Sequence, residues 1–291
     1  MSINFILPGM YEHHKMLFNL LKLKQECPEY FLENLNISAI YGNFQFCIWD
    51  GGRIFSNYKH TTREEIKEIQ FIYNNIFKVP IRFVFTNSEL KEEHLHDRFC
   101  NMIMRECEND MNEIVVNSSL LENYIREKYP KYKIISSTTK CLSNPEEFKK
   151  EISNNKYYMV CLDYNLNKNL NLLNSLNNEE KIRCEFLVNA VCPSGCPSRK
   201  EHYRLNSLFS LSYGKNYKTK VCGIRESHLI SNQKTLKNNL SQLECLEYVK
   251  MGFNNFKLEG RTFNKNALAI TIIQYIVKPE YQLYVLNELL R

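Results

Sequence analysis

Several features that would place a chain of 291 residues in a familiar functional class are missing from this sequence. No run of about 18 apolar residues occurs, so no membrane-spanning helix is expected. The first nine residues lack the basic segment and the long apolar core of a signal peptide, which predicts a cytoplasmic protein. Because that compartment is reducing, the 11 cysteines are not expected to form a disulfide framework.

Concentrated positive charge is missing as well. Lysine and arginine total 38 against 32 aspartates and glutamates, a net charge of +6, but the basic residues are scattered and often stand beside acids. Nucleic-acid binding therefore stays open without being indicated. The Gly-x-Ser-x-Gly and His-Glu-x-x-His motifs of hydrolases are also absent, so a cluster-free peptidase or hydrolase is the least supported kind of enzyme.

What the sequence does contain is a regular alternation of short apolar runs and longer amphipathic segments. The predicted strands are Ile37–Phe44, Ile81–Thr86, Glu113–Asn117, Lys133–Thr139, Tyr157–Asp163, Arg183–Asn189, His228–Ser231 and Phe256–Arg261. Between them, Thr62–Glu65 forms a capping box, Asn144 caps a helix that opens with Pro145, and helices are expected over Asn232–Lys250 and Lys265–Val277.

This order predicts a parallel sheet with crossover helices, in a single domain spanning residues 1–291. Eight strands over this length favour a (β/α)8, TIM-like barrel, either regular or irregular and incomplete. An open doubly wound sheet is the alternative, but the Gly-rich phosphate turn that usually follows its first strand is missing here.

Several of the apolar runs end in small polar residues. In a barrel these ends meet at the face where such enzymes hold their active sites. Many of the residues have a simpler explanation as caps of the following helices. Asp163 and Asn189 each end an apolar strand directly, so we expect them to bind substrate.

The strongest chemical signal is the loop after the sixth predicted strand. It reads Cys192-Pro193-Ser194-Gly195-Cys196, and a cysteine in a loop rich in Pro and Gly is a poor core residue. Two thiolates at this spacing suit a soft metal or an iron–sulfur cluster. Two cysteines buried in a turn are the alternative.

A cluster normally needs four protein ligands. Cys222 is the best third ligand, because it lies in the following loop region beside Gly223. The fourth stays open among Cys47, Cys100 and Cys141, and a three-ligand zinc or iron site with an open position is the alternative. His202 follows the cysteine loop closely and is a candidate for metal binding or proton transfer.

The last predicted strand carries alternating charges. Lys257, Glu259 and Arg261 share one face, whereas Phe256 and Leu258 face the other way. Charges inside a barrel must pair or contact a ligand, so this set fits either an anionic substrate or a structural ion network. Arg53 stands near the end of the first predicted strand, on a Gly-rich loop expected to be flexible enough to close over the site.

These features together resemble the U32 peptidase-like family. The resemblance rests on Glu185–Cys196, Arg199, His202-Tyr203, Gly252 and the sequence FKLEGR at Phe256–Arg261. It implies a barrel related to oxygen-independent hydroxylases or their accessory proteins, several of which hold a four-iron–four-sulfur cluster. Cys192, Cys196 and Cys222 are then cluster ligands, and Glu259 and Arg261 are site residues. The compressed cysteine spacing departs from the family pattern, as does the lack of a second close cysteine pair.

The leading hypothesis is therefore an iron–sulfur barrel that performs or assists a hydroxylation-type modification of an unknown substrate. Glu259, Arg261 and His202 are its candidate catalytic residues, and Lys257, Arg53, Asn189 and Asp163 its candidate substrate-binding residues. A non-catalytic accessory barrel with a protein partner is the second hypothesis. Its candidate docking surface is the C-terminal segment Tyr281–Leu290.

Overall fold

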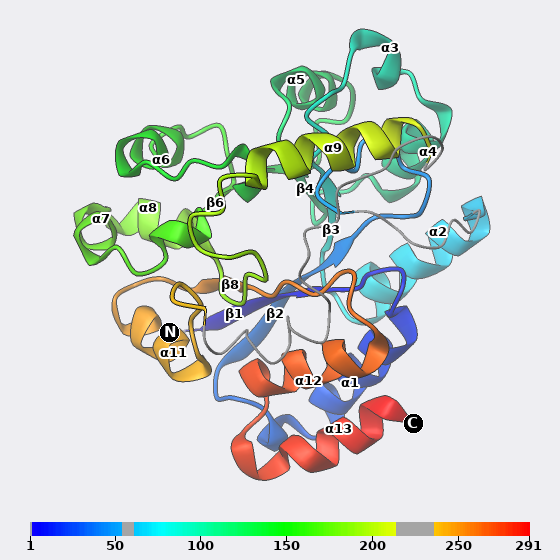
Figure 1. Ribbon diagram of the computed structural model, residues 1–291. Helices are drawn as coiled ribbons and strands as arrows, with labels where there is room; N and C mark the ends of the chain where they lie inside the picture. The colour runs from blue at the N-terminus through cyan, green and yellow to red at the C-terminus, as the bar shows by residue number, and fades with distance from the viewer. Residues whose placement is uncertain (1, 54–60, 214–235) are drawn as a thin grey trace.

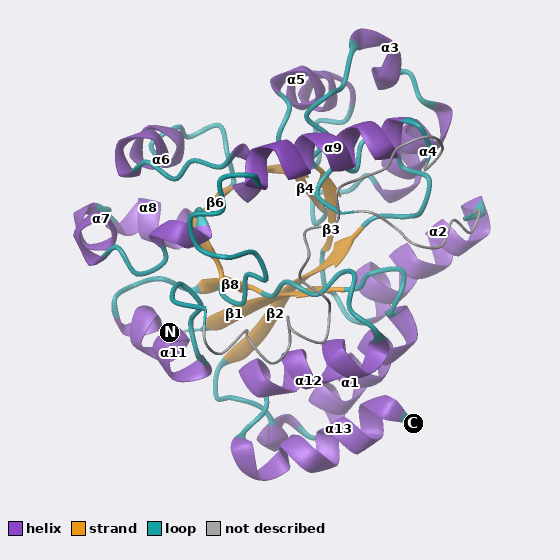
Figure 2. Cartoon of the chain, viewed as in Figure 1, coloured by secondary structure: helices purple, strands orange, loops and turns teal. Residues whose placement is uncertain are grey.

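A computed structural model describes residues 2–53, 61–213 and 236–291 of the chain. Eight parallel strands form a closed barrel in sequence order, with β1 paired to both β2 and β8 (Figures 1 and 2). Their bounds are β1 Ile3–Pro8, β2 Leu35–Gly42, β3 Ile81–Phe85, β4 Glu113–Val116, β5 Lys133–Ser136, β6 Met159–Cys161, β7 Cys184–Leu187 and β8 Asn255–Lys257. The predicted (β/α)8 barrel is thus confirmed.

Helices surround this barrel, numbered as in Figure 1. They are α1 His14–Glu26, α2 Arg63–Gln70, α3 Glu92–Leu95, α4 Arg98–Cys107, α5 Ser119–Lys128, α6 Pro145–Ile152, α7 Leu170–Ser175, α8 Asn178–Arg183, α9 Arg199–Leu211, α11 Gln242–Lys250, α12 Lys265–Ile276 and α13 Gln282–Leu290. The chain also contains four 3-10 helices among the described residues, η1 Pro28–Tyr30, η3 Thr138–Lys140, η4 Tyr164–Leu166 and η6 Pro279–Tyr281. A short π-helix, η2 Phe71–Ile76, continues α2. No described helix is both long and apolar enough to span a membrane.

The strand assignments need one correction. Strand β1, Ile3–Pro8, was missing from the sequence prediction, although it closes the barrel between β2 and β8. The predicted strand His228–Ser231 lies outside the described residues. Strand pairing also ends earlier than expected in β6, β7 and β8, because the polar residues beyond those ends bind neighbouring loops instead of continuing the ladder.

The predicted helix signals agree more closely with the structure. Thr62 and Glu65 form the expected capping box of α2, and the Asn144 side chain caps α6. Helix α12 covers nearly the predicted range. The helix expected over Asn232–Lys250 begins only at Gln242, where Ser241 and Glu244 form a capping box that fixes the first turn.

The inside of the barrel has an apolar layer and a charged layer. The apolar layer consists of Ile6, Ala39, Tyr41, Val84, Val115, Ile135, Met159 and Cys161. In the charged layer, fully buried Arg82 donates to Glu113 at 2.6 Å and to Glu185. The Lys257 ammonium lies 4.0 Å from Glu185. Two cations and two carboxylates balance one another, which makes their burial tolerable.

Arg82→Met should destabilise the fold by about 3–5 kcal/mol, because Glu113 and Glu185 would lose their shared cation while staying buried. Urea unfolding would measure the change. Arg63→Met is the matched control: the exposed Arg63 side chain pairs with Glu106 at the surface, and its loss should leave the free energy of unfolding nearly unchanged. Equal losses in the two variants would contradict this account of the charged layer.

Candidate functional site

The carboxyl ends of the strands surround a small cavity of about 70 Å³, at the face where barrels of this kind hold their sites. We call it the mouth cavity. It is lined by Tyr41, Gly52, Arg53, Val84, Thr86, Ser137, Thr138, Thr139, Leu187, Tyr203, Lys257, Glu259 and Arg261. The predicted alternation of Lys257, Glu259 and Arg261 is confirmed, since all three line this cavity while Phe256 and Leu258 lie in the outer core.

Glu259 is held in place from two directions. The Asn189 side chain accepts a hydrogen bond from the Glu259 backbone N–H at 2.6 Å and donates one to its carbonyl at 2.9 Å. The Glu259 carboxylate pairs with Arg53 and accepts the backbone N–H of Val191 at 3.0 Å. Asn189 was predicted to bind substrate; in the structure its amide joins the β7 loop to the segment after β8.

Arg261 makes a bidentate ion pair with Asp50, at 2.9 and 3.1 Å. Asp50 lies in the loop after β2 and is only 1% exposed. The loop was expected to be flexible, but at Gly51 it packs closely on the loop after β3. A Cβ there would lie 2.5 Å from the Asn87 Cα atom. Glycine therefore permits the close approach that fixes Asp50 and Arg53 at the cavity.

Helix α9 covers one side of the mouth and binds loops from four strands. Arg199 pairs with Asp163 at 2.6 Å and donates to the Thr138 carbonyl, while its guanidinium lies 4.1 Å from the centre of the Tyr164 ring. Farther along, the Asn206 side chain donates to the Gly52 carbonyl, and the Ser207 carbonyl accepts from Asn87. Figure 1 shows α9 lying across this part of the barrel. Asp163, predicted to bind substrate, instead anchors this helix.

His202 lies in the first turns of α9, half-buried. Burial, together with the positive charge of Arg53, lowers the pKa of its imidazole below the ordinary value. The side chain is therefore neutral at pH 7 and able to accept a proton close to the Arg53–Glu259 pair. The predicted catalytic candidates Glu259, Arg261 and His202 thus gather at one end of the barrel.

Cys192 and Cys196 are free, half-buried and close enough for their thiols to interact. Burial raises the pKa of Cys192, and Tyr164 and Arg199 partly oppose that effect. Cys222 lies outside the described residues. Within the described ranges no group of three metal-binding side chains occurs, so the two thiols alone do not complete a metal site.

The candidates for a fourth ligand differ in their surroundings. Cys47 and Cys100 are buried against each other, with their sulfur atoms 3.2 Å apart. Each thiol therefore already has a partner away from the cysteine loop. Cys141 is half-buried and feels the charges of Arg199 and Asp163, the pair that anchors α9. Of these three cysteines, Cys141 is the one close to Arg199, whose charge also acts on Cys192 in the cysteine loop.

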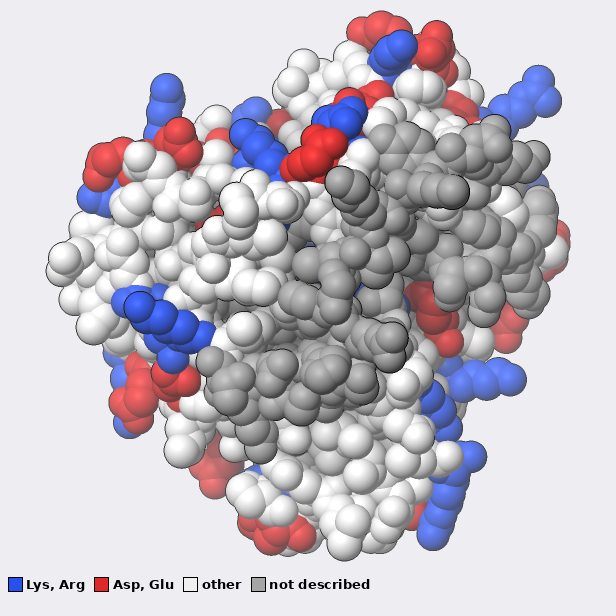
Figure 3. Space-filling model, viewed as in Figure 1, with Lys and Arg blue, Asp and Glu red and all other residues white. Residues whose placement is uncertain are grey.

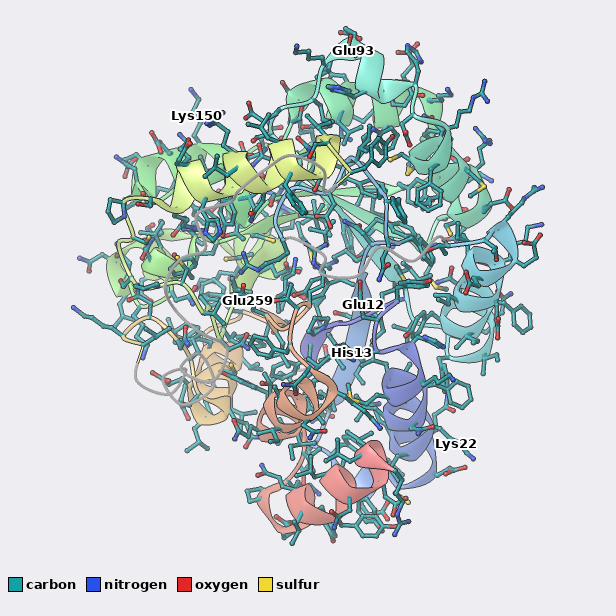
Figure 4. All side chains as sticks on the ribbon, turned by 45° about the vertical axis from the view of Figure 1, so that its right-hand side comes forward. Glu12, His13, Lys22, Glu93, Lys150 and Glu259 are labelled. Atoms are coloured by element: carbon teal, nitrogen blue, oxygen red, sulfur yellow. The ribbon has the colours of Figure 1, made fainter. Side chains whose placement is uncertain are left out.

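Two charged residues escaped sequence reasoning, Asp50 and Glu12. Glu12 lies in the loop after β1, and neither of its carboxylate oxygens has a hydrogen-bond partner among the described residues. Burial raises its pKa to about 7, although nearby Arg261 acts in the opposite direction. Figure 4 labels Glu12 and Glu259 on the segments that follow β1 and β8. The sequence signal for Glu12 is its position shortly after an apolar run. That run is β1, which the sequence prediction does not include.

The raised pKa of Glu12 makes stability depend on pH. An unfolded Glu12 loses its proton near pH 4.5 and the folded one near pH 7, so stability falls as the pH rises through this window. Glu12→Gln removes that loss. The variant should be more stable than the parent by about 3 kcal/mol at pH 8, a difference that disappears as the pH falls to about 4.5 and below.

Urea unfolding at a series of pH values would measure this difference. Glu33→Gln, at an exposed position, is the control and should follow the parent at every pH. A constant difference between Glu12→Gln and the parent across the series would show that the carboxyl titrates at its ordinary pH in the folded protein.

No protein-family model matches the chain, and the search of curated proteins found no match. The site must therefore be interpreted from its own geometry. Figure 3 shows basic and acidic side chains interspersed around the edge of the visible face, without a continuous basic patch among the described residues drawn there. This pattern agrees with the scattered charge of the sequence.

Proposed function

We propose that this barrel performs or assists a hydroxylation-type modification of a substrate bound at the mouth cavity, with an iron–sulfur cluster held beside it. One contact carries the proposal. The Val191 N–H, directly before Cys192, donates to the Glu259 carboxylate at 3.0 Å. The cysteine loop therefore contacts the charged segment after β8, and this contact supports the proposal that both belong to one site.

The cysteine loop fits two ligands of such a cluster. Its thiols are half-buried, mutually close and mounted on a Pro/Gly turn. Residue Asn238, soon after the undescribed segment that contains Cys222, donates to Ser194 Oγ at 2.6 Å. The chain therefore re-enters the described structure beside the two cysteines. A bound cluster would supply electrons to an oxygen donor or bind that donor, whose oxygen atom the modification transfers to the substrate, and zinc on three ligands is the alternative.

The surrounding residues have distinct roles in this proposal. Lys257 and Arg53 attract and orient the oxygen atoms of an anionic or polar substrate. Glu259 sets the position of Arg53, and Asp50 does the same for Arg261. Neutral His202 accepts or returns a proton near Arg53. Helix α9, anchored by Arg199 and Asp163, keeps water from one side of the cavity.

The cluster can be tested by measuring iron, acid-labile sulfide and zinc after anaerobic purification, together with an ultraviolet–visible spectrum. The parent protein should contain iron and sulfide, and Cys192→Ser should lose most of both, because one ligand is removed from the loop. Cys27→Ser is the matched control: Cys27 is also free and half-buried, but it follows α1 away from the mouth and should not affect the metal content.

Iron-free parent protein with fully reduced thiols would overturn the cluster proposal. Zinc in place of iron and sulfide would instead support the three-ligand alternative. Loss of metal in Cys27→Ser as well would mean that metal content follows general folding and not the cysteine loop.

A non-catalytic accessory role is supported by a different surface. Leu283 and Tyr284 of α13 are 72% and 50% exposed, whereas Val285 and Leu289 of the same helix are buried on the side that packs against α1 and α12. Exposed apolar side chains on a helix that is already packed are typical of a surface that binds another protein. In that role the barrel would present a partner enzyme with substrate or electrons.

A further inference from the structure

Lys257 occupies a chemically special position. It is the last residue of β8, its side chain points into the barrel, and it lines the mouth cavity while being only 6% exposed. Its neighbours Tyr41, Val84 and Leu187 present largely apolar surface. A lysine at the carboxyl end of a barrel strand stands where catalytic side chains of this fold are found.

The ammonium group of Lys257 has few partners. Its nearest carboxylate oxygen, on Glu185, is 4.0 Å away, and the Tyr41 ring centre is 4.3 Å away. By contrast, the other two cations of the cavity, Arg53 and Arg261, form close ion pairs with Glu259 and Asp50. An arginine also stays charged at any physiological pH, so Lys257 is the cavity cation that can become a nucleophile.

The environment favours the neutral amine. Burial lowers the pKa of Lys257, and the positive charges of Arg82 and Arg261 lower it further, while Glu185 partly opposes them. Burial also raises the pKa of Glu113 at the other end of the charged layer. If a proton moved from Lys257 to Glu113, Arg82 and Glu185 would still balance each other, so the interior can hold the neutral amine without a net charge.

A second unpartnered group faces the same cavity. Thr86 is 1% exposed, and its hydroxyl oxygen has no hydrogen-bond partner within the described part of the chain. A buried hydroxyl without a hydrogen-bond partner costs free energy. A ligand oxygen that accepts a hydrogen bond from this hydroxyl would remove that cost. The cavity of about 70 Å³ is small, comparable to about two water molecules in the liquid. It therefore suits the small end of a ligand that carries an oxygen atom.

We propose that Lys257 forms an imine with a small carbonyl compound, whose carbonyl oxygen first accepts a hydrogen bond from Thr86. The neutral amine adds to the carbonyl carbon. Both amine protons then leave with the carbonyl oxygen as water, and a carbon–nitrogen double bond remains. When the imine takes up a proton, its positive charge lies where Glu185 already balances the ammonium. This activity goes beyond the proposed modification and needs no cluster.

Reductive trapping tests the proposal without a known substrate. The full chain is incubated at pH 7 with pyruvate and cyanoborohydride, which delivers hydride to the imine carbon, and the modified lysines are located by peptide mass spectrometry. A single reduced adduct should form at Lys257. Each unit by which its pKa is lowered raises the neutral fraction about tenfold over that of an ordinary lysine, so surface lysines should react far less.

Matched variants make the result specific. Lys257→Arg should lose the adduct, whereas Lys265→Arg should keep it, because Lys265 lies at the start of α12 and donates to the Leu290 carbonyl. Gly52→Ala should reduce trapping without changing the lysine. Its new Cβ would lie 3.2 Å from Thr86 Oγ1 and 3.8 Å from an Arg261 nitrogen, which narrows the cavity.

Adducts spread over surface lysines with none at Lys257 would overturn the proposal. So would unchanged trapping at Lys257 in Gly52→Ala, since the carbonyl compound would then not occupy the space beside Thr86. The trapping experiment measures an adduct at Lys257, whereas the cluster experiment measures iron and sulfide bound by the cysteine loop. Loss of the cluster and loss of the imine are therefore separate results, and either proposal can fail alone.

Discussion

The ion pairs between Arg82 and the two glutamates Glu113 and Glu185 constrain the whole interior of this barrel. Arg82 and Glu113 are register partners on β3 and β4, while Glu185 reaches the same guanidinium from β7. Barrel interiors of this class are usually filled with branched apolar side chains, which need no particular partner. A buried cation needs a carboxylate partner at a fixed position, so β3, β4 and β7 must keep their relative positions for the interior to remain neutral.

The charged layer also connects the closed end of the barrel to its mouth. One oxygen of Glu185 pairs with Arg82, and the other accepts the Cys161 thiol at 2.8 Å and faces Lys257. Burial alone would raise the pKa of Glu185, but Arg82 and Lys257 hold it below the ordinary value. The carboxylate therefore stays ionised beneath the cavity. A change of charge at Lys257 therefore acts on the charged layer below it through Glu185.

Sequence reasoning could predict the barrel because each element carries a local signal: β-branched strands, a capping box at Thr62 and an Asn–Pro helix start. It missed β1 because Ile3–Pro8 is a single short apolar run at the start of the chain, and its role as a strand depends on pairing with both β2 and β8 when the barrel closes. At the site it predicted Lys257, Glu259 and Arg261 from their alternation. It could not predict Asp50 or Glu12, because their importance comes from barrel closure, which brings Asp50 into an ion pair with Arg261 and Glu12 within range of the Arg261 charge. The spacing of residues along the sequence does not predict interactions between residues so far apart in the chain.

The pattern of pairing at the mouth decides where a ligand can bind. Arg261 and Arg199 are each held by a buried carboxylate from a different loop, so a ligand that replaced either carboxylate would have to disrupt an existing ion pair. Separating buried partners costs several kcal/mol, which small ligands rarely recover. Lys257 and Thr86 require no such exchange, because the described residues leave the Lys257 amine without a close carboxylate and the Thr86 hydroxyl without a hydrogen bond. The paired arginines thus shape the cavity and exclude alternative positions, while binding and chemistry are directed to the amine and the hydroxyl.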